Sequence, residues 1–179
     1  LDNDTEMWFV DPRTFGEVVV YDPANAASEL PPIARLGVDP IAEDFPRSHL
    51  RQLVRATNQK LKPFLLDQTK VAGIGNIYAD EILHRARLRP DRSAKTIDAA
   101  ATWRLHDAIR NILNDSIKAG GSTLGDAQYV DVEGEVGSFQ NEHRVYGRAG
   151  QRCSTCARGW IRRTIAGGRS THHCPVCQH

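Results

Sequence analysis

The stretch VAGIGNIYADE, residues 71–81, joins a glycine-rich turn to a run of residues with helical character. Gly73 and Gly75 allow the backbone to come close to a ligand, because glycine has no Cβ. The helix that follows would direct its free N–H groups and the positive end of its dipole at the turn, which favours an anion. These residues alone leave two interpretations open. The turn is either a plain connection between packed helices or an anion-binding turn, to which Asn76 adds a side-chain amide.

The residues around this turn predict a helical domain. Apolar residues recur at helical spacing over 48–61, over 77–87 and after Thr96, which is expected to cap the third helix. The pair Lys62-Pro63 is expected to interrupt the first helix, and the glycines at 120–121 are expected to end the third.

Short β-elements are expected at both ends of the chain. Residues 8–20 predict two short strands around a turn, and the proline-rich residues 23–46 predict a linker. Near the other end, the alternating residues around Ile161, Arg163 and Ile165 predict a hairpin that turns at the glycines 167–168. The expected fold class is therefore mostly α with small β elements.

Composition and charge narrow the class of protein. The chain has 179 residues, of which 40% are hydrophobic, so it is long enough to bury a core. It has no apolar run long enough to span a membrane and no signal-peptide pattern, so a cytoplasmic protein is expected. The net charge of +1 hides an asymmetry, since residues 47–93 carry ten basic and four acidic residues, and residues 151–179 carry five arginines and no carboxylate. Two basic blocks predict one positive surface, although ordinary solvated faces are the alternative for either block alone.

The four cysteines predict a metal site. They form two C-x2-C pairs separated by seventeen residues, which is a spacing typical of tetrahedral zinc. Four thiolates make a closed shell with no open position, so the ion would be structural and one Zn²⁺ per chain is expected. Two disulfides are the alternative, which the lack of a secretory signal disfavours. The expected ligands are Cys153, Cys156, Cys174 and Cys177.

The residues between the cysteine pairs suit a phosphate backbone. Arg162, Arg163 and Arg169 have no acidic residue nearby. His172 and His173 are expected at the surface or on phosphates, because four cysteines already fill the metal shell. A protein-binding zinc ribbon is the alternative interpretation of this segment taken alone.

Several motifs together resemble one enzyme family. FLLDQTKVAGIGNIYADEIL at 64–83 resembles the helix–two-turn–helix motif of the formamidopyrimidine-DNA glycosylase and endonuclease VIII family of base-excision repair enzymes. The similarity continues, in family order, through DPRTFG, GGSTL, GEVGSFQ, VYGR and the cysteine-rich hairpin. It therefore covers essentially the whole chain.

The resemblance implies roles for individual residues. Asn76, at the turn with Gly75, and Arg169 would grip the phosphates on either side of a damaged nucleotide, and Arg169 would also take part in elimination. Tyr146 would be a further phosphate contact, and Lys62 would lie near the lesion pocket. Tyr78 is either a phosphate contact or a core residue.

Other implied roles concern the gap that an extruded nucleotide leaves in DNA. Phe15 would wedge into the base stack and Arg13 would bind the orphaned base, although a core residue is the alternative for Phe15. The glycine-rich residues 120–138 resemble the loop that covers an extruded oxidised purine, and the part at 126–128 matches no pattern.

The implied activity is that of a bifunctional DNA glycosylase and AP lyase. Such an enzyme removes 8-oxoguanine and formamidopyrimidines from duplex DNA and nicks the strand by β,δ-elimination. The family's nucleophile is an N-terminal proline with a neighbouring glutamate, and Leu1-Asp2 cannot fill those roles. We therefore expect the complete protein to have an upstream segment and this chain to be inactive alone. A truncated, non-catalytic binder of damaged or abasic DNA is the alternative.

The resemblance also implies an organisation in four parts. Residues 1–22 would end an N-terminal β-sandwich catalytic domain, and 23–46 would form the linker. Residues 47–150 would form the helix–two-turn–helix domain with its lesion-covering loop, and 151–179 the zinc finger. The expected protein is a bacterial-type, nucleoid-associated monomer that binds duplex DNA.

Overall fold

The computed structural model of the chain describes residues 6–11, 16–42, 44–123 and 134–179. It divides into two units, Leu1–Arg35 and Leu36–His179. Within its described residues, the first unit contains three short helical segments, η1 (Pro23–Asn25), α1 (Ala26–Glu29) and α2 (Pro31–Ala34). Its described residues before Pro23 form no strand, contrary to the expectation for residues 8–20. A strand requires a hydrogen-bonded neighbour, and the described residues of this unit provide none.

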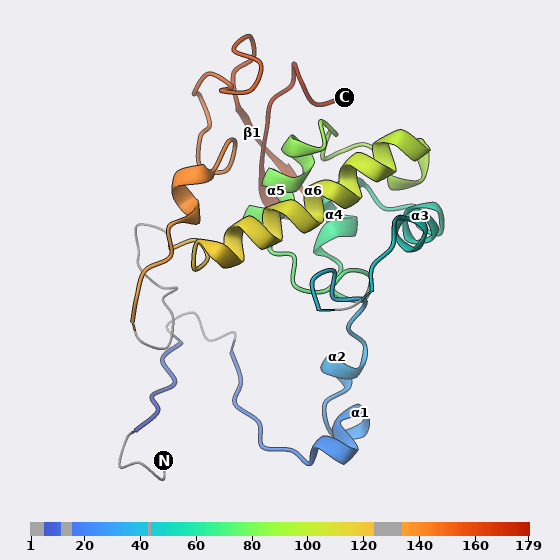
Figure 1. The fold of residues 1–179 in the computed structure, drawn as a ribbon, viewed down its shortest axis with the longest axis vertical. Coiled ribbons are helices and arrows are strands. Elements are labelled where there is room, and N and C mark those ends of the chain that lie inside the picture. Colours follow the sequence, from blue (N-terminus) through green and yellow to red (C-terminus); the bar gives the residue numbers. More distant parts are fainter. Residues whose placement is uncertain (1–5, 12–15, 43, 124–133) are drawn as a thin grey trace. The chain divides into compact units, whose positions relative to one another are not determined.

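The second unit holds the main helical core. Its elements are α3 (Arg47–Arg55), α4 (Leu61–Leu66), α5 (Asn76–Arg85), η2 (Ala94–Thr96), α6 (Ala99–Lys118), η3 (Phe139–Glu142), β1 (Arg162–Ala166) and β2 (Arg169–His173). The long helix α6 packs against α5 and α3, and α4 packs against α5 (Figure 1). Their apolar faces form one buried cluster, with Leu50, Phe64, Ile82, Leu105 and Ile109 among its members.

The boundary between the units falls inside the predicted linker. Val38 and Phe45 are buried in the core of the second unit. Val38 also forms a parallel bridge with Val71, just before the glycine-rich turn. Residues 36–42 and 44–45 are therefore built into the helical unit.

Two helix boundaries differ from the sequence expectation, and a third agrees with it. The first predicted helix, expected over 48–61, ends at Arg55 in the structure. Pro63 does not interrupt a helix but lies in the first turn of α4, where a missing N–H breaks no helical hydrogen bond. Asp98 caps α6 by accepting from the N–H of Ala101 at 2.7 Å, whereas Thr96 belongs to η2. The end of α6 agrees with the prediction, because Gly121 has a φ of +82° and donates its N–H to the carbonyl of Ser116.

The two C-terminal strands form an antiparallel hairpin. Ala166 pairs with Arg169 across a turn made by Gly167 and Gly168, whose φ values are +57° and +73°. Two positive φ angles fit the type I′ turn that matches the twist of a hairpin. Val145 and Ile161 pack with the cysteines in a second, smaller core.

A buried ionic network joins the hairpin to the helical core. Lys62 and Asp80 are both fully buried, and the Lys62 Nζ atom lies 2.6 Å from Asp80 Oδ1. The same ammonium donates to the carbonyl of Ser170 on β2 at 2.8 Å. Asp80 Oδ2 accepts from the backbone N–H of His172 at 2.8 Å and contacts its Nδ1 atom at 3.2 Å. Burial lowers the pKa of Lys62, and the carboxylate of Asp80 opposes that shift.

Within the described residues, every helix is too short or too polar to cross a lipid bilayer.

The Asp80→Asn substitution is expected to lower the free energy of unfolding by about 3 kcal/mol, because it leaves the Lys62 ammonium buried without its counterion. Asp107→Asn is the matched control, since the Arg47–Asp107 pair is about half exposed on both sides. Its loss is expected to stay below about 1 kcal/mol. Urea unfolding followed by circular dichroism measures both values. Equal losses in the two variants would show that the buried pair contributes no more than a surface pair.

Candidate functional site

The glycine-rich turn is held in shape by two polar side chains. Asp67 accepts from the backbone N–H of Thr69 at 3.1 Å and from its hydroxyl at 2.6 Å, and it pairs with Lys70. The pKa of the Asp67 carboxyl lies well below its usual range; burial acts to raise it, and the hydrogen bonds from Lys70 and Thr69 outweigh that effect. Gln68 accepts from the N–H of Gly73 and donates to the carbonyl of Ile74. The turn is therefore shaped by its own residues.

The N-terminus of α5 is open. Gly75 is the N-cap residue and makes no side-chain cap, so the first N–H groups of the helix remain available. A Cβ added at Gly73 or Gly75 would meet no heavy atom within 4 Å among the described residues. This space, beside a helix N-terminus, suits a phosphate.

Asn76 is the first residue of α5 and brings a side-chain amide to this open terminus. Its Oδ1 atom is buried and has no hydrogen-bond partner in the described part of the chain. The other end of the amide, Nδ2, is a donor and so matches an anion chemically. This geometry is compatible with an anion at the turn, and the role of the turn stays a prediction.

Arg169 stands at the tip of the hairpin, where β2 begins, and its side chain is exposed. The tip approaches α4, because a Cβ at Gly167 would lie 3.0 Å from Pro63 Cγ. The Asp80 network fixes the same strand through Ser170 and His172. Arg169 is therefore held at a set position relative to α5.

Lys62 does not lie on the surface that carries Asn76 and Arg169. It was expected near the lesion pocket, but its side chain is fully buried and its ammonium bonds to Asp80 and Ser170. Its charge is neutralised inside the protein, so it cannot contact DNA directly in this structure. Its effect on the position of Arg169 is indirect, because it holds the hairpin and α5 together.

Tyr146 lies on a loop that α5 also holds. The carboxylate of Glu81 accepts three backbone N–H groups, from Arg144 at 2.9 Å, Val145 at 3.0 Å and Tyr146 at 2.8 Å. The half-buried ring of Tyr146 meets the ring of His172 edge-on, with centroids 5.0 Å apart. The candidate contacts Asn76, Tyr146 and Arg169 are thus all positioned by α5 and its partners.

Sequence reasoning missed Asp80 and Glu81. Both are buried, with exposures of 0% and 2%. They lie in a helix whose predicted apolar face consisted of other residues. The only signal was that the two carboxylates stand between Ala79 and Ile82, inside the stripe itself.

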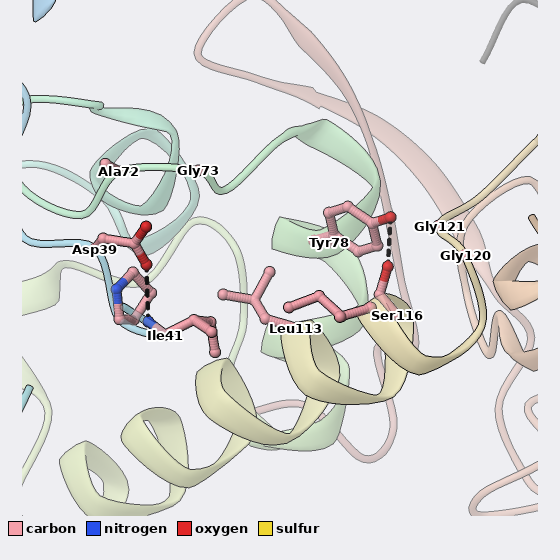
Figure 2. Close-up of a pocket in the computed structure, with 11 residues that line it drawn as sticks. Asp39, Ile41, Ala72, Gly73, Tyr78, Leu113, Ser116, Gly120 and Gly121 are labelled. Carbon is pink, nitrogen blue, oxygen red and sulfur yellow. Dashed lines mark hydrogen bonds between the residues drawn. The ribbon is translucent and has the colours of Figure 1, made fainter. Parts of the chain in front are cut away.

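An open apolar cavity of about 410 Å³ lies between the turn and the end of α6. Figure 2 shows Asp39 and Ile41 on one side of it and Tyr78 and Ser116 on the other. The hydroxyl groups of Tyr78 and Ser116 are hydrogen-bonded at 2.6 Å, and Tyr78 packs against the core. The core interpretation of Tyr78 is thereby favoured over a phosphate contact.

Some of the predicted positions cannot be placed. Arg13 and Phe15, the expected void-filling residues, lie outside the described residues, as do residues 126–128 of the glycine-rich loop. The flanks of that loop are described and approach closely, since the N–H of Phe139 donates to the carbonyl of Gly121.

The four cysteines come together at one point. All are free thiols, and their Sγ atoms lie within 4.8 Å of one another. The Cys153–Cys177 and Cys156–Cys174 sulfur separations are 3.8 Å and 3.7 Å. Four sulfurs placed about 2.3 Å from a central ion at tetrahedral angles would be about 3.8 Å apart. The arrangement therefore fits a tetrahedral metal ion and is too wide for disulfides.

Electrostatics also favours a cation among these sulfurs. Backbone N–H groups of Arg158 and Gly159 lower the pKa of Cys156 to about 6, which favours its thiolate. Burial, together with the neighbouring sulfurs, raises the pKa of Cys177 far above its usual range. Thiolates crowded in this way repel one another, and a divalent ion would remove that repulsion.

Comparisons with known proteins identify the family. Residues 36–128 match the family model described as the formamidopyrimidine-DNA glycosylase H2TH domain. A formamidopyrimidine-DNA glycosylase of Halalkalibacterium halodurans is 42% identical over 174 residues, which are 97% of this chain and 62% of that protein.

Two solved structures show the same fold. The MutM (Fpg) protein of Thermus thermophilus has a TM-score of 0.87 and 42% identity, over 94% of this chain and 62% of the other. The Lactococcus lactis Fpg in complex with DNA containing an abasic site has a TM-score of 0.77 and 39% identity, over 87% and 56%. The chain thus spans about three-fifths of the length of these relatives. The chain belongs to the formamidopyrimidine-DNA glycosylase family and contains its H2TH domain.

Proposed function

We propose that the chain is the DNA-binding part of a base-excision repair DNA glycosylase with AP lyase activity. The substrates would be oxidised purines, namely 8-oxoguanine and formamidopyrimidines in duplex DNA, and the strand would be nicked by β,δ-elimination. The observation that carries this proposal is the open N-terminus of α5, joined through Asp80 to the strand that begins with Arg169. Support comes from a Lactococcus lactis relative whose structure contains Fapy-dG DNA.

In this proposal three groups bind the phosphates of one strand. The N–H groups after Gly75 and the Nδ2 of Asn76 bind one phosphate, and Arg169 binds a neighbouring one as a charged donor. Tyr146 adds a further contact from the loop that Glu81 holds. These contacts are to the backbone, so they position the DNA without reading its sequence.

The proposed metal is one Zn²⁺ held by Cys153, Cys156, Cys174 and Cys177. Its role is structural, because four thiolates leave no coordination position for water or substrate. The ion would fix the residues that precede and follow the hairpin, and with them the position of Arg169.

The chemical step in this proposal belongs to the whole protein. The resemblance assigns the nucleophile to a proline amine next to a glutamate, and neither is at the start of these 179 residues. Residues 1–22 would complete a β-sandwich catalytic domain, in which Arg13 and Phe15 would fill the gap left by an extruded nucleotide. Residues 23–46 would connect it to the H2TH domain at 47–150 and the zinc finger at 151–179. The protein would act as a monomer in the bacterial cytoplasm, on the nucleoid.

Asn76→Ala and Arg169→Ala are each expected to weaken binding to a duplex with an abasic site by about tenfold or more, because each removes a donor to a charged phosphate. Arg169→Ala should also reduce the slope of log K against log salt by about one unit, whereas Asn76→Ala should leave it unchanged. Arg51→Ala, an exposed arginine on α3, is the control. Fluorescence anisotropy titrations at several salt concentrations measure these effects. If Arg169→Ala binds like Arg51→Ala, Arg169 does not bind phosphate.

Elemental analysis is expected to find one zinc per chain. Removing the ion with a chelator should disorder the hairpin and weaken DNA binding, because the ligands must converge for this segment to fold. The backbone amide signals of residues 151–179 in NMR spectra report the disorder, and those of α6 provide the internal control. Finding no zinc, or disulfide-linked peptides by mass spectrometry, would rule out this site.

The 179-residue chain alone is expected to bind abasic duplexes but to cleave neither base nor strand, because it places no proline amine at the sugar C1′. Fusion to an upstream domain that begins with Pro-Glu should restore both activities. Borohydride trapping on abasic and 8-oxoguanine duplexes tests this with and without that domain. An adduct formed by the isolated chain would place the nucleophile within these 179 residues. Binding without trapping in both forms would support the non-catalytic alternative.

A further inference from the structure

The last turn of α5 brings an imidazole to the cysteine cluster. His84 is 3% exposed, and its Nε2 atom lies 3.6 Å from Cys153 Sγ and 3.8 Å from Cys177 Sγ. These two sulfurs come from different C-x2-C pairs, so a single ring nitrogen faces both halves of the centre. No motif in the sequence predicted this contact.

The ring approaches the sulfurs as an outer partner and not as a ligand. The group of atoms that lie within 4.8 Å of one another contains the four cysteine sulfurs and no histidine nitrogen. Four thiolates already complete a tetrahedral shell. The remaining way for a nitrogen at this distance to interact is to donate its N–H to sulfur.

Such a donor would matter because the centre carries excess negative charge. A divalent ion with four thiolates has a net charge of −2, and Cys153 and Cys174 are almost fully buried. A buried anion needs hydrogen-bond donors in place of the water that it has lost. Backbone N–H groups of Arg158 and Gly159 supply donors at Cys156, and His84 is placed to supply one at Cys153 and Cys177.

The position of His84 on its helix gives the contact a wider consequence. Asp80 and His84 are four residues apart, so they lie on one face of α5. Asp80 holds the hairpin strand β2, while His84 meets the cysteine pairs that flank the hairpin. The helix that begins with Asn76 therefore ends against the metal centre.

We propose that His84 is a positioning residue of the metal centre, whose Nε2–H donates to the thiolates of Cys153 and Cys177 and slows loss of the ion. This inference rests on the proposed zinc site. An apolar ring of similar size could fill the same space but could not donate. Comparing donor and non-donor side chains therefore separates the hydrogen bond from packing.

The test compares His84→Phe, which keeps the bulk, with His84→Gln, which keeps an N–H donor. The rate of zinc transfer from the full chain to the chelator 4-(2-pyridylazo)resorcinol is the readout. His84→Phe is expected to release zinc about tenfold faster than the unmodified chain, in line with the effect of outer-shell partners on metal affinity. His84→Gln should recover most of that loss. His49→Phe on α3 is the control and should release zinc at the unmodified rate.

A second measurement needs no substitution. In the unmodified chain loaded with ¹¹³Cd and labelled with ¹⁵N, the His84 ring should carry its proton on Nε2, and that proton should show scalar coupling to cadmium through the hydrogen bond. A ring proton on Nδ1 would overturn the inference, as would equal release rates for His84→Phe and the unmodified chain. An unmodified chain that binds no zinc would overturn the zinc proposal and this inference together, whereas equal release rates overturn this inference alone.

Discussion

The position of Arg169 relative to the N-terminus of α5 depends on the hydrogen bonds of the buried Asp80 carboxylate. This carboxylate accepts from the ammonium of Lys62, and its second oxygen accepts from the backbone of His172, while Lys62 also donates to Ser170. Buried ions are tolerated only when their partners are in place, so this network allows one placement of the hairpin on α5 and α4. Because Arg169 is next to Ser170, the same network also constrains the position of Arg169.

Side chains along helix α5 contact three neighbouring segments. Asp80 fixes the hairpin, Glu81 fixes the loop of Tyr146 with three N–H bonds, and His84 faces the cysteine sulfurs. The cysteine-rich end and the helical core consequently form one compact unit, Leu36–His179. A helix that binds an anion at its N-terminus can do so reproducibly only if its other contacts keep it still, and these three side chains provide them.

The sequence was informative where local chemistry decides the structure. The hairpin turn at 167–168, the end of α6 and the convergence of the cysteines follow from glycine conformations and ligand spacing, and all three are observed. The sequence did not predict features that depend on a partner residue distant along the chain. Hydrophobic periodicity treats charged residues as solvent-facing, so it could not reveal that Asp80 and Lys62 bury each other, because their compatibility depends on tertiary contacts 18 residues apart. Local pattern likewise left Pro63 as a helix breaker, although the first turn of α4 accommodates it.

The division of charge between buried and exposed groups explains how the surface proposed to bind phosphate can stay stably folded. Its buried charges, Lys62 and Asp80, are neutralised internally and hold the frame, whereas Arg169 remains exposed and free to meet an anion. At the open end of α5, Gly75 leaves the first N–H groups to water, which costs the helix only a few tenths of a kcal/mol relative to a good side-chain cap. A phosphate would replace that water with a charged acceptor aligned with the helix dipole. Within the described residues, the buried side chains of Lys62 and Asp80 thus have their hydrogen-bond partners inside the protein, whereas the first N–H groups of α5 are left for an external acceptor such as a phosphate.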